Sequence, residues 1–217
     1  MGRKITDPQE IEALFRLLNR MADGYEATEK EAAELEEIDE IGTPDFITSS
    51  EFFNAVSMRR ELAISLRGVD QLKCLCTLNL CYISVSDLSG THFPDRIQSL
   101  NLSSTQITSL DGVHLSAELH SLDLSDTQIA SLKDVQLPTG LQSLDLSGTQ
   151  ITSLDGIYLP AKLQSLKLSS TQITSLDGIR LPAEIQSLNL SDTQITSLDG
   201  VQLPAGLQSL KLRGTQI

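Results

Sequence analysis

The stretch 141–162 reads LQSLDLSGTQITSLDGIYLPAK, and near-copies of it follow one another through most of the chain. The copies have a period of 22 residues and begin at Leu75, Ile97, Leu119, Leu141, Leu163, Ile185 and Leu207. A degenerate unit starts at Phe53, and a partial unit occupies residues 207–217. Self-similarity at a fixed period of this size is typical of a solenoid, in which each unit buries its apolar side chains only against neighbouring units.

Each unit predicts a short strand followed by a return segment rich in turns. Leu144 and Leu146 alternate with polar residues, as side chains do along an extended segment with one buried face. Asp155-Gly156 is a turn signal, and Pro160 blocks a regular helix. Stacked units therefore form a parallel sheet with one strand per unit. The apolar side chains that bring the return segment to the core are Leu154, Ile157 and Leu159.

The leucine positions resemble the leucine-rich repeat family, whose pattern is L-x-x-L-x-L-x-x-N/C-x-L, over about three quarters of the chain. The 22-residue length is similar to that of the internalin-type class. The LPAxL junction resembles that of bacterial effectors injected into host cells, which typically use shorter units. The resemblance implies an α/β solenoid: a right-handed superhelix with one parallel β-sheet on its concave face, short turn or 3-10 segments on its convex face, and an N-terminal helical cap.

One departure from the family pattern concerns its asparagine ladder, which is threonine in this chain. A threonine hydroxyl donates one hydrogen bond where an asparagine amide donates two, so we expect a slightly looser turn in the same fold. The threonines are Thr105, Thr127, Thr149, Thr171, Thr193 and Thr215.

Residues 1–52 differ from the repeats of 53–217 in charge and in pattern. They hold 14 Asp or Glu against 5 Lys or Arg, and the whole chain has a formal net charge of -13. Asp7-Pro8 favours a helix over about residues 8–22, with an apolar stripe on one face. We expect this segment to be a helical cap, because the end of a solenoid must be covered.

A second helix is predicted over about residues 28–41. Thr28 with Glu31 forms a capping box at its start, and Gly42 fits its end. Two interpretations of this helix remain open. Its acidic residues between Glu29 and Glu40 are a solvated surface of the cap, or they dock a basic partner.

Composition excludes several classes of function. The negative charge opposes binding to nucleic acid, whose phosphates need clustered Lys and Arg. No apolar run is long enough to span a membrane, and the start MGRKITDPQE lacks the apolar segment of a secretory signal. We therefore expect no nucleic-acid or membrane partner, and a protein that is cytoplasmic or is exported without a cleaved signal peptide.

Little in the sequence supports catalysis or a bound cofactor, so no catalytic residue, metal ligand or cofactor is predicted. The three histidines are His92, His114 and His120, and no serine or cysteine has a base and an orienting acid at a spacing typical of hydrolases. Three cysteines, Cys74, Cys76 and Cys81, are best interpreted as reduced thiols, since a zinc site would need a fourth ligand. The turn acids Asp111, Asp155, Asp177 and Asp199 fit turn chemistry better than a calcium site.

The remaining candidate is a protein-binding surface. In the leucine-rich repeat family, ligands usually contact the residues between the leucines of the strands. One such position varies between units while its Gln-Ser neighbours scarcely change, and its acidic middle and basic end could orient a partner. The predicted partner-binding residues on the concave face are Tyr82, Asn101, His120, Asp123, Asp126, Asp145, Lys167, Asn189, Lys211 and Arg213. A second, weaker candidate column lies off the strand at His92, His114, Gln136, Tyr158, Arg180 and Gln202.

Three functions follow from these residues. The leading hypothesis is a non-enzymatic scaffold that binds a partner protein through the concave face. The alternative is a recognition module of a larger effector or enzyme that continues beyond Ile217. The third is self-assembly, because the partial unit Leu207–Ile217 predicts a strand with an uncovered edge, which gives a monomer or an end-to-end dimer.

Overall fold

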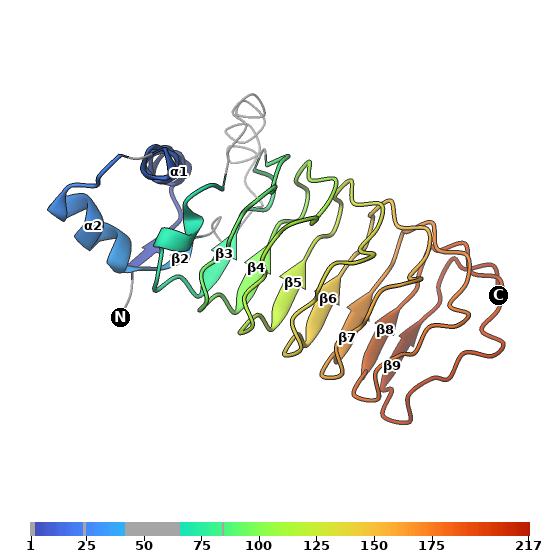
Figure 1. The fold of residues 1–217 in the computed structure, drawn as a ribbon. Coiled ribbons are helices and arrows are strands. Elements are labelled where there is room, and N and C mark those ends of the chain that lie inside the picture. The colour runs from blue at the N-terminus through green and yellow to red at the C-terminus, as the bar shows by residue number, and fades with distance from the viewer. Residues whose placement is uncertain (1–2, 24, 42–65, 84) are drawn as a thin grey trace.

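The computed structural model describes residues 3–23, 25–41, 66–83 and 85–217. Its parallel sheet has nine strands, and their spatial order is their order in the chain. In Figure 1 the strands stand side by side along the molecule, with helices α1 and α2 at the β1–β2 end. The strands are Arg3–Ile5 (β1), Ile38–Ile41 (β2), Thr77–Asn79 (β3), Ser99–Asn101 (β4), Ser121–Asp123 (β5), Ser143–Asp145 (β6), Ser165–Lys167 (β7), Ser187–Asn189 (β8) and Ser209–Lys211 (β9).

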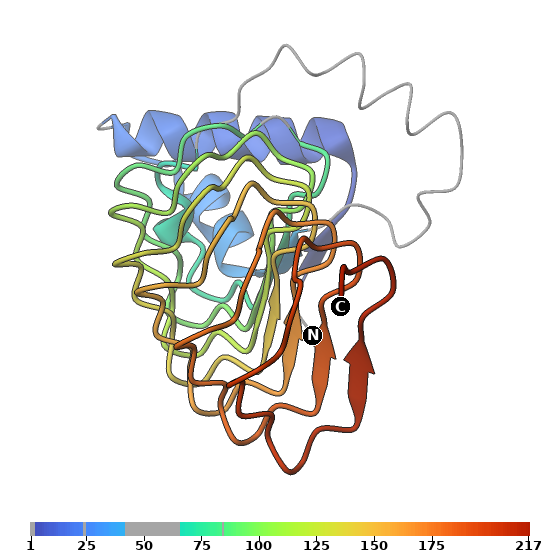
Figure 2. The same ribbon diagram turned by 90° about the vertical axis from the view of Figure 1, so that its right-hand side faces the viewer.

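The predicted solenoid with one strand per unit is confirmed, because each repeat strand pairs with the strand 22 residues later. Leu144 of β6 lies opposite Leu122 of β5 and Leu166 of β7. The return segments are tied together as well, since the backbone N–H of Gln150 donates to the carbonyl of Ile129 at 2.9 Å. Figure 2 views the coils end on, with the sheet on one side and the turns on the other.

The core is a stack of the same side chains from successive coils. Leu144, Leu146 and Ile151 are fully buried, and so are their counterparts in the neighbouring units. Ile157 and Leu159 are only partly buried, so the return segment contributes less to the core than the strand does. The leucines around β9 are also only partly buried against this core, namely Leu207, Leu210 and Leu212.

The buried threonine column satisfies backbone carbonyls within each coil. The hydroxyl of Thr149 donates to the carbonyl of Leu146 at 2.6 Å, and the other five threonines make the same bond three residues back. The single hydroxyl proton of each threonine is therefore used inside its own turn. These bonds fasten the end of the strand to the start of the return segment.

Replacing Thr149 by valine should lower the free energy of unfolding by about 1 kcal/mol, because the isosteric side chain leaves the Leu146 carbonyl without its hydroxyl donor. Urea denaturation of the variant measures this loss. Thr152→Val is the control, since Thr152 lies exposed in the same coil. Equal stability of the two variants would show that the hydroxyl bond contributes nothing.

The N-terminal cap contains two helices and two strands. Helix α1 spans Pro8–Ala22, and the Asp7 side chain caps it by accepting from the backbone N–H groups of Gln9 and Glu10. Helix α2 spans only Glu29–Glu36, so the predicted helix over 28–41 is wrong at its C-terminal end. Residues 38–41 are strand β2 instead, because they hydrogen-bond between β1 and β3 and bury Ile38 and Ile41.

Helix α1 packs against the first described coil. Its buried residues Ile11, Phe15 and Leu18 share one core with Leu66 and with Val69 of the 3-10 helix η1, Val69–Gln71. An ion pair of 2.9 Å between Arg67 and Asp23 lies beside this contact. The cap thus covers the apolar end of the solenoid. The domain boundary predicted at residues 52 and 53, and the start of the degenerate unit, lie outside the described residues.

Candidate interaction surface

The sheet face carries one column of variable side chains. These residues end the repeat strands, and the parallel register places each beside the next. Lys167 and Lys211 are exposed, and the other members are half-buried. The column, called the strand-end column below, is Asn79, Asn101, Asp123, Asp145, Lys167, Asn189 and Lys211.

The asparagines and aspartates of this column also hold the turn that follows each strand. A side-chain oxygen of Asp145 accepts from the backbone N–H of Ser147 at 3.0 Å, and one oxygen of Asp123 accepts from both the N–H and the hydroxyl of Ser125. Asn79, Asn101 and Asn189 make the same bond to the residue two positions on. The sequence pattern did not indicate this turn-forming role, although Asn and Asp favour such turns.

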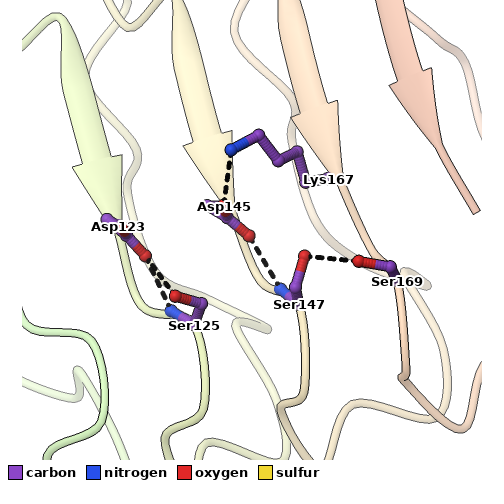
Figure 3. Close-up of polar contacts among 6 residues, drawn as sticks. All are labelled: Asp123, Ser125, Asp145, Ser147, Lys167 and Ser169. Carbon is purple, nitrogen blue, oxygen red and sulfur yellow. Dashed lines mark hydrogen bonds and ion pairs between the residues drawn. The ribbon is translucent and has the colours of Figure 1, made fainter. Parts of the chain in front are cut away.

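Lys167 connects two coils across the sheet face. Its ammonium donates to Oδ2 of Asp145 at 2.9 Å, and the Ser169 hydroxyl donates to that of Ser147 at 2.9 Å (Figure 3). The hydrogen bond to Asp145 raises the pKa of Lys167 above its ordinary value, and the charges of Asp145 and Asp123 raise it further against partial desolvation. Asp145 and Lys167 therefore offset each other, and Asp123 carries more of the negative potential of the face.

The other predicted residues lie around the strand-end column. Tyr82 and Asp126 each follow a repeat strand, with φ values of 61° and 55°. His120 is half-buried just before β5, and Arg213 is exposed just after β9. Six strand steps of about 4.8 Å place Tyr82 and Arg213 roughly 29 Å apart along the sheet. The predicted residues therefore form a long strip, within which Asp145 and Lys167 form an ion pair.

The turn acids and cysteines show local roles. The backbone N–H of Asp155 donates to the Ser153 hydroxyl oxygen at 3.0 Å, and the other turn acids repeat this bond. The Cys76 thiol donates to the carbonyl of Cys74, and no disulfide joins the three cysteines.

Within residues 3–23, 25–41, 66–83 and 85–217, no three potential ligands among His, Cys, Asp and Glu gather for a metal ion. No helix in these ranges is long and apolar enough to cross a bilayer.

A parallel sheet with one short strand per 22-residue unit, closed by turns over stacked leucines, defines a leucine-rich repeat solenoid, and this chain has that fold. The family model described as Leucine Rich repeats (2 copies) matches residues 139–181. The crystal structure of internalin C2 from Listeria monocytogenes is similar, with a TM-score of 0.64 and 22% identity over 94% of this chain and 84% of that chain. The fold is therefore internalin-like.

Two further solved structures are similar at lower scores. Internalin F from Listeria monocytogenes has a TM-score of 0.46 and 16% identity over 96% of this chain and 69% of that chain. YopM from Yersinia enterocolitica has a TM-score of 0.43 and 20% identity over 82% of this chain and 46% of that chain. Comparison with curated protein sequences gives no match.

Proposed function

We propose that the protein is a non-enzymatic scaffold that binds a partner protein on the outer face of its sheet. The observation that carries this proposal is the strand-end column, where charge and polarity change from coil to coil while the serines beside it stay the same. A repeat needs no such variation to fold, because from β4 to β8 the strand leucine and the buried threonine that follows it are the same in each coil. Variation along one face of the sheet, beside a constant core, is typical of a recognition surface.

The shape and charge of the strip suit an extended partner. Asp123 lies one coil before the Asp145–Lys167 pair, and Lys211 lies two coils after it. A partner with a basic part over β5 and an acidic part over β9 would match this order, so charge sets the direction in which it docks. Tyr82, which is 42% exposed, offers an aromatic contact at the other end of the strip.

A triple charge reversal tests the proposal: Asp123→Lys, Asp145→Lys and Lys167→Glu. The reversed pair at 145 and 167 keeps opposite charges in contact, and Lys167 and Lys211 show that the strand accepts lysine at this position. We expect the immobilised variant to recover at least about tenfold less partner than the unmodified protein does, which is the loss of about 1.4 kcal/mol of binding free energy. Quantitative mass spectrometry of the captured proteins measures this.

The matched control is Lys133→Glu, Asp155→Lys and Asp177→Lys. These three residues also occupy one position in successive coils, they lie exposed in the turns, and the net charge changes by the same amount. The control should recover the partner fully. If the sheet variant recovers it equally well, binding does not use the strand-end column.

Two other hypotheses stay predictions. One is a recognition module of a larger effector or enzyme, which would use the same strip to select its substrate. This hypothesis differs from the scaffold only in requiring a further domain in the protein. The other is end-to-end pairing through Leu207–Ile217, a segment whose leucines are partly buried against the core.

A further inference from the structure

His92 and His114 lie side by side on neighbouring coils, away from the sheet. Their ring centroids are 4.3 Å apart and the ring planes are tilted by 34°. Both side chains are exposed. The two residues begin the weaker candidate column predicted off the strand, and their separation of 22 positions places them on neighbouring coils.

The backbone holds this pair in place. His92 and His114 form a parallel bridge, in which Phe93 N–H donates to the His114 carbonyl and His114 N–H donates to the Thr91 carbonyl, both at 3.2 Å. Thr91 and Phe93 are buried on either side of His92. The two imidazoles therefore start from fixed Cα positions, which lowers the entropy lost when both rings bind one ligand.

In the neutral His92 ring, the position of the single N–H proton leaves the other ring nitrogen able to bind a metal. Its Nδ1 lies 3.0 Å from the carbonyl oxygen of Gly90. A carbonyl oxygen can only accept, so Nδ1 carries the proton and Nε2 of the neutral ring keeps its lone pair. Histidines that bind metals usually donate their other ring N–H to a backbone carbonyl or carboxylate in this way.

The surroundings of the pair leave room for a hydrated ion. Both rings line a surface cavity of about 400 Å³. Asp70 and Asp95 also line it, as do Lys73 and Arg96, so the fixed charges around the cavity balance. Since no third potential ligand joins the pair among the described residues, water would complete the coordination shell.

We propose that His92 and His114 together bind one late first-row divalent metal ion between two coils. Imidazole nitrogen is a preferred ligand of Zn²⁺, Ni²⁺ and Cu²⁺. Two nitrogens that each lie about 2.0–2.1 Å from one ion are about 3–3.5 Å from each other, which adjacent rings reach by small side-chain rotations. The ion would link residues that are 22 positions apart and so brace the coils that follow the cap.

Titration of the tag-free chain with Ni²⁺ by calorimetry tests this site. We expect one ion per chain, with affinity at least about tenfold weaker in His92→Gln and in His114→Gln. Glutamine is compatible with the coil, because Gln136 and Gln202 occupy the same column in other units. The control His120→Gln should bind as the unmodified chain does, since His120 lies beside β5 on the sheet.

A second measurement uses the unmodified protein and does not depend on any substitution. Paramagnetic Ni²⁺ should broaden the ring proton signals of His92 and His114 in NMR spectra while leaving those of His120 sharp. Binding should weaken on acidification, because protons compete for the imidazole nitrogens. Equal affinity in all four proteins, or equal broadening of all three histidines, would overturn the proposal and assign the bound nickel to thiols or carboxylates elsewhere.

Discussion

Gly68→Ala is expected to separate helix α1 from the first coil and to lower the free energy of unfolding by about 3–5 kcal/mol. Gly68 has a φ of 80°, and a Cβ at this position would lie 2.5 Å from the carbonyl oxygen of Leu18. That oxygen belongs to the α1 backbone, so no side-chain rotation relieves the overlap, and the helix or the coil must shift. Urea denaturation, with hydrogen exchange of the α1 amides, measures both effects.

The repeat supplies a matched control, because Gly90 occupies the same position one unit later. Its φ is 68°, and a Cβ there would meet nothing within 4 Å. Gly90→Ala should therefore show only the cost of the left-handed backbone, about 1–2 kcal/mol, and leave α1 protected. Asp134 shows that this column accepts a side chain, since it has a φ of 65°. Equal losses in the two variants would mean that α1 does not approach Gly68.

The second large effect is expected at Gly148, where alanine should lower the free energy of unfolding by about 2–3 kcal/mol. Gly148 has a φ of 67°, and an added Cβ would overlap Oδ1 of Asp126 in the preceding coil. The overlapping atom ends a short side chain, which can rotate, so the loss is smaller than at Gly68. Gly178→Ala, with a φ of 75° and open space, measures the backbone part alone.

A double-mutant cycle separates the clash from the strain. Asp126→Gly removes the carboxylate, and glycine suits that backbone because Gly148 and Gly214 adopt the same conformation in the same column. Gly148→Ala should then cost only the strain when it is made in the Asp126→Gly background. A cost that is the same in both backgrounds would show that the two residues do not interact.

The same contact between an aspartate and a glycine of the next coil occurs a second time in the chain. Asp192 lies against Gly214 as Asp126 lies against Gly148, so each aspartate in this column is followed by glycine one unit later. Serine follows glycine in the column at position 170. Residues of this column thus contact one another between neighbouring coils, although any single unit resembles the others.

Much of the candidate surface could be predicted, because a period of 22 residues identifies which residues are neighbours between coils. It placed Asp123, Asp145 and Lys167 in one column, which the register confirms. The period did not show that the Asp145 carboxylate accepts from the Ser147 N–H and also pairs with the Lys167 ammonium. Both contacts depend on side-chain rotamers. The use of the strip by a partner stays a prediction.

The sequence by itself determined the solenoid, its strands and its buried leucine and threonine columns. These features repeat, so each coil meets the same neighbours and a local pattern has the same structural meaning in every unit. Only the tertiary structure decided what happens outside the repeat. Residues 38–41 became a strand because the sheet offered hydrogen-bond partners on both sides, and Gly68 differs from Gly90 because α1 lies against one and not the other. Such contacts join segments with no shared period, so no spacing in the sequence encodes them.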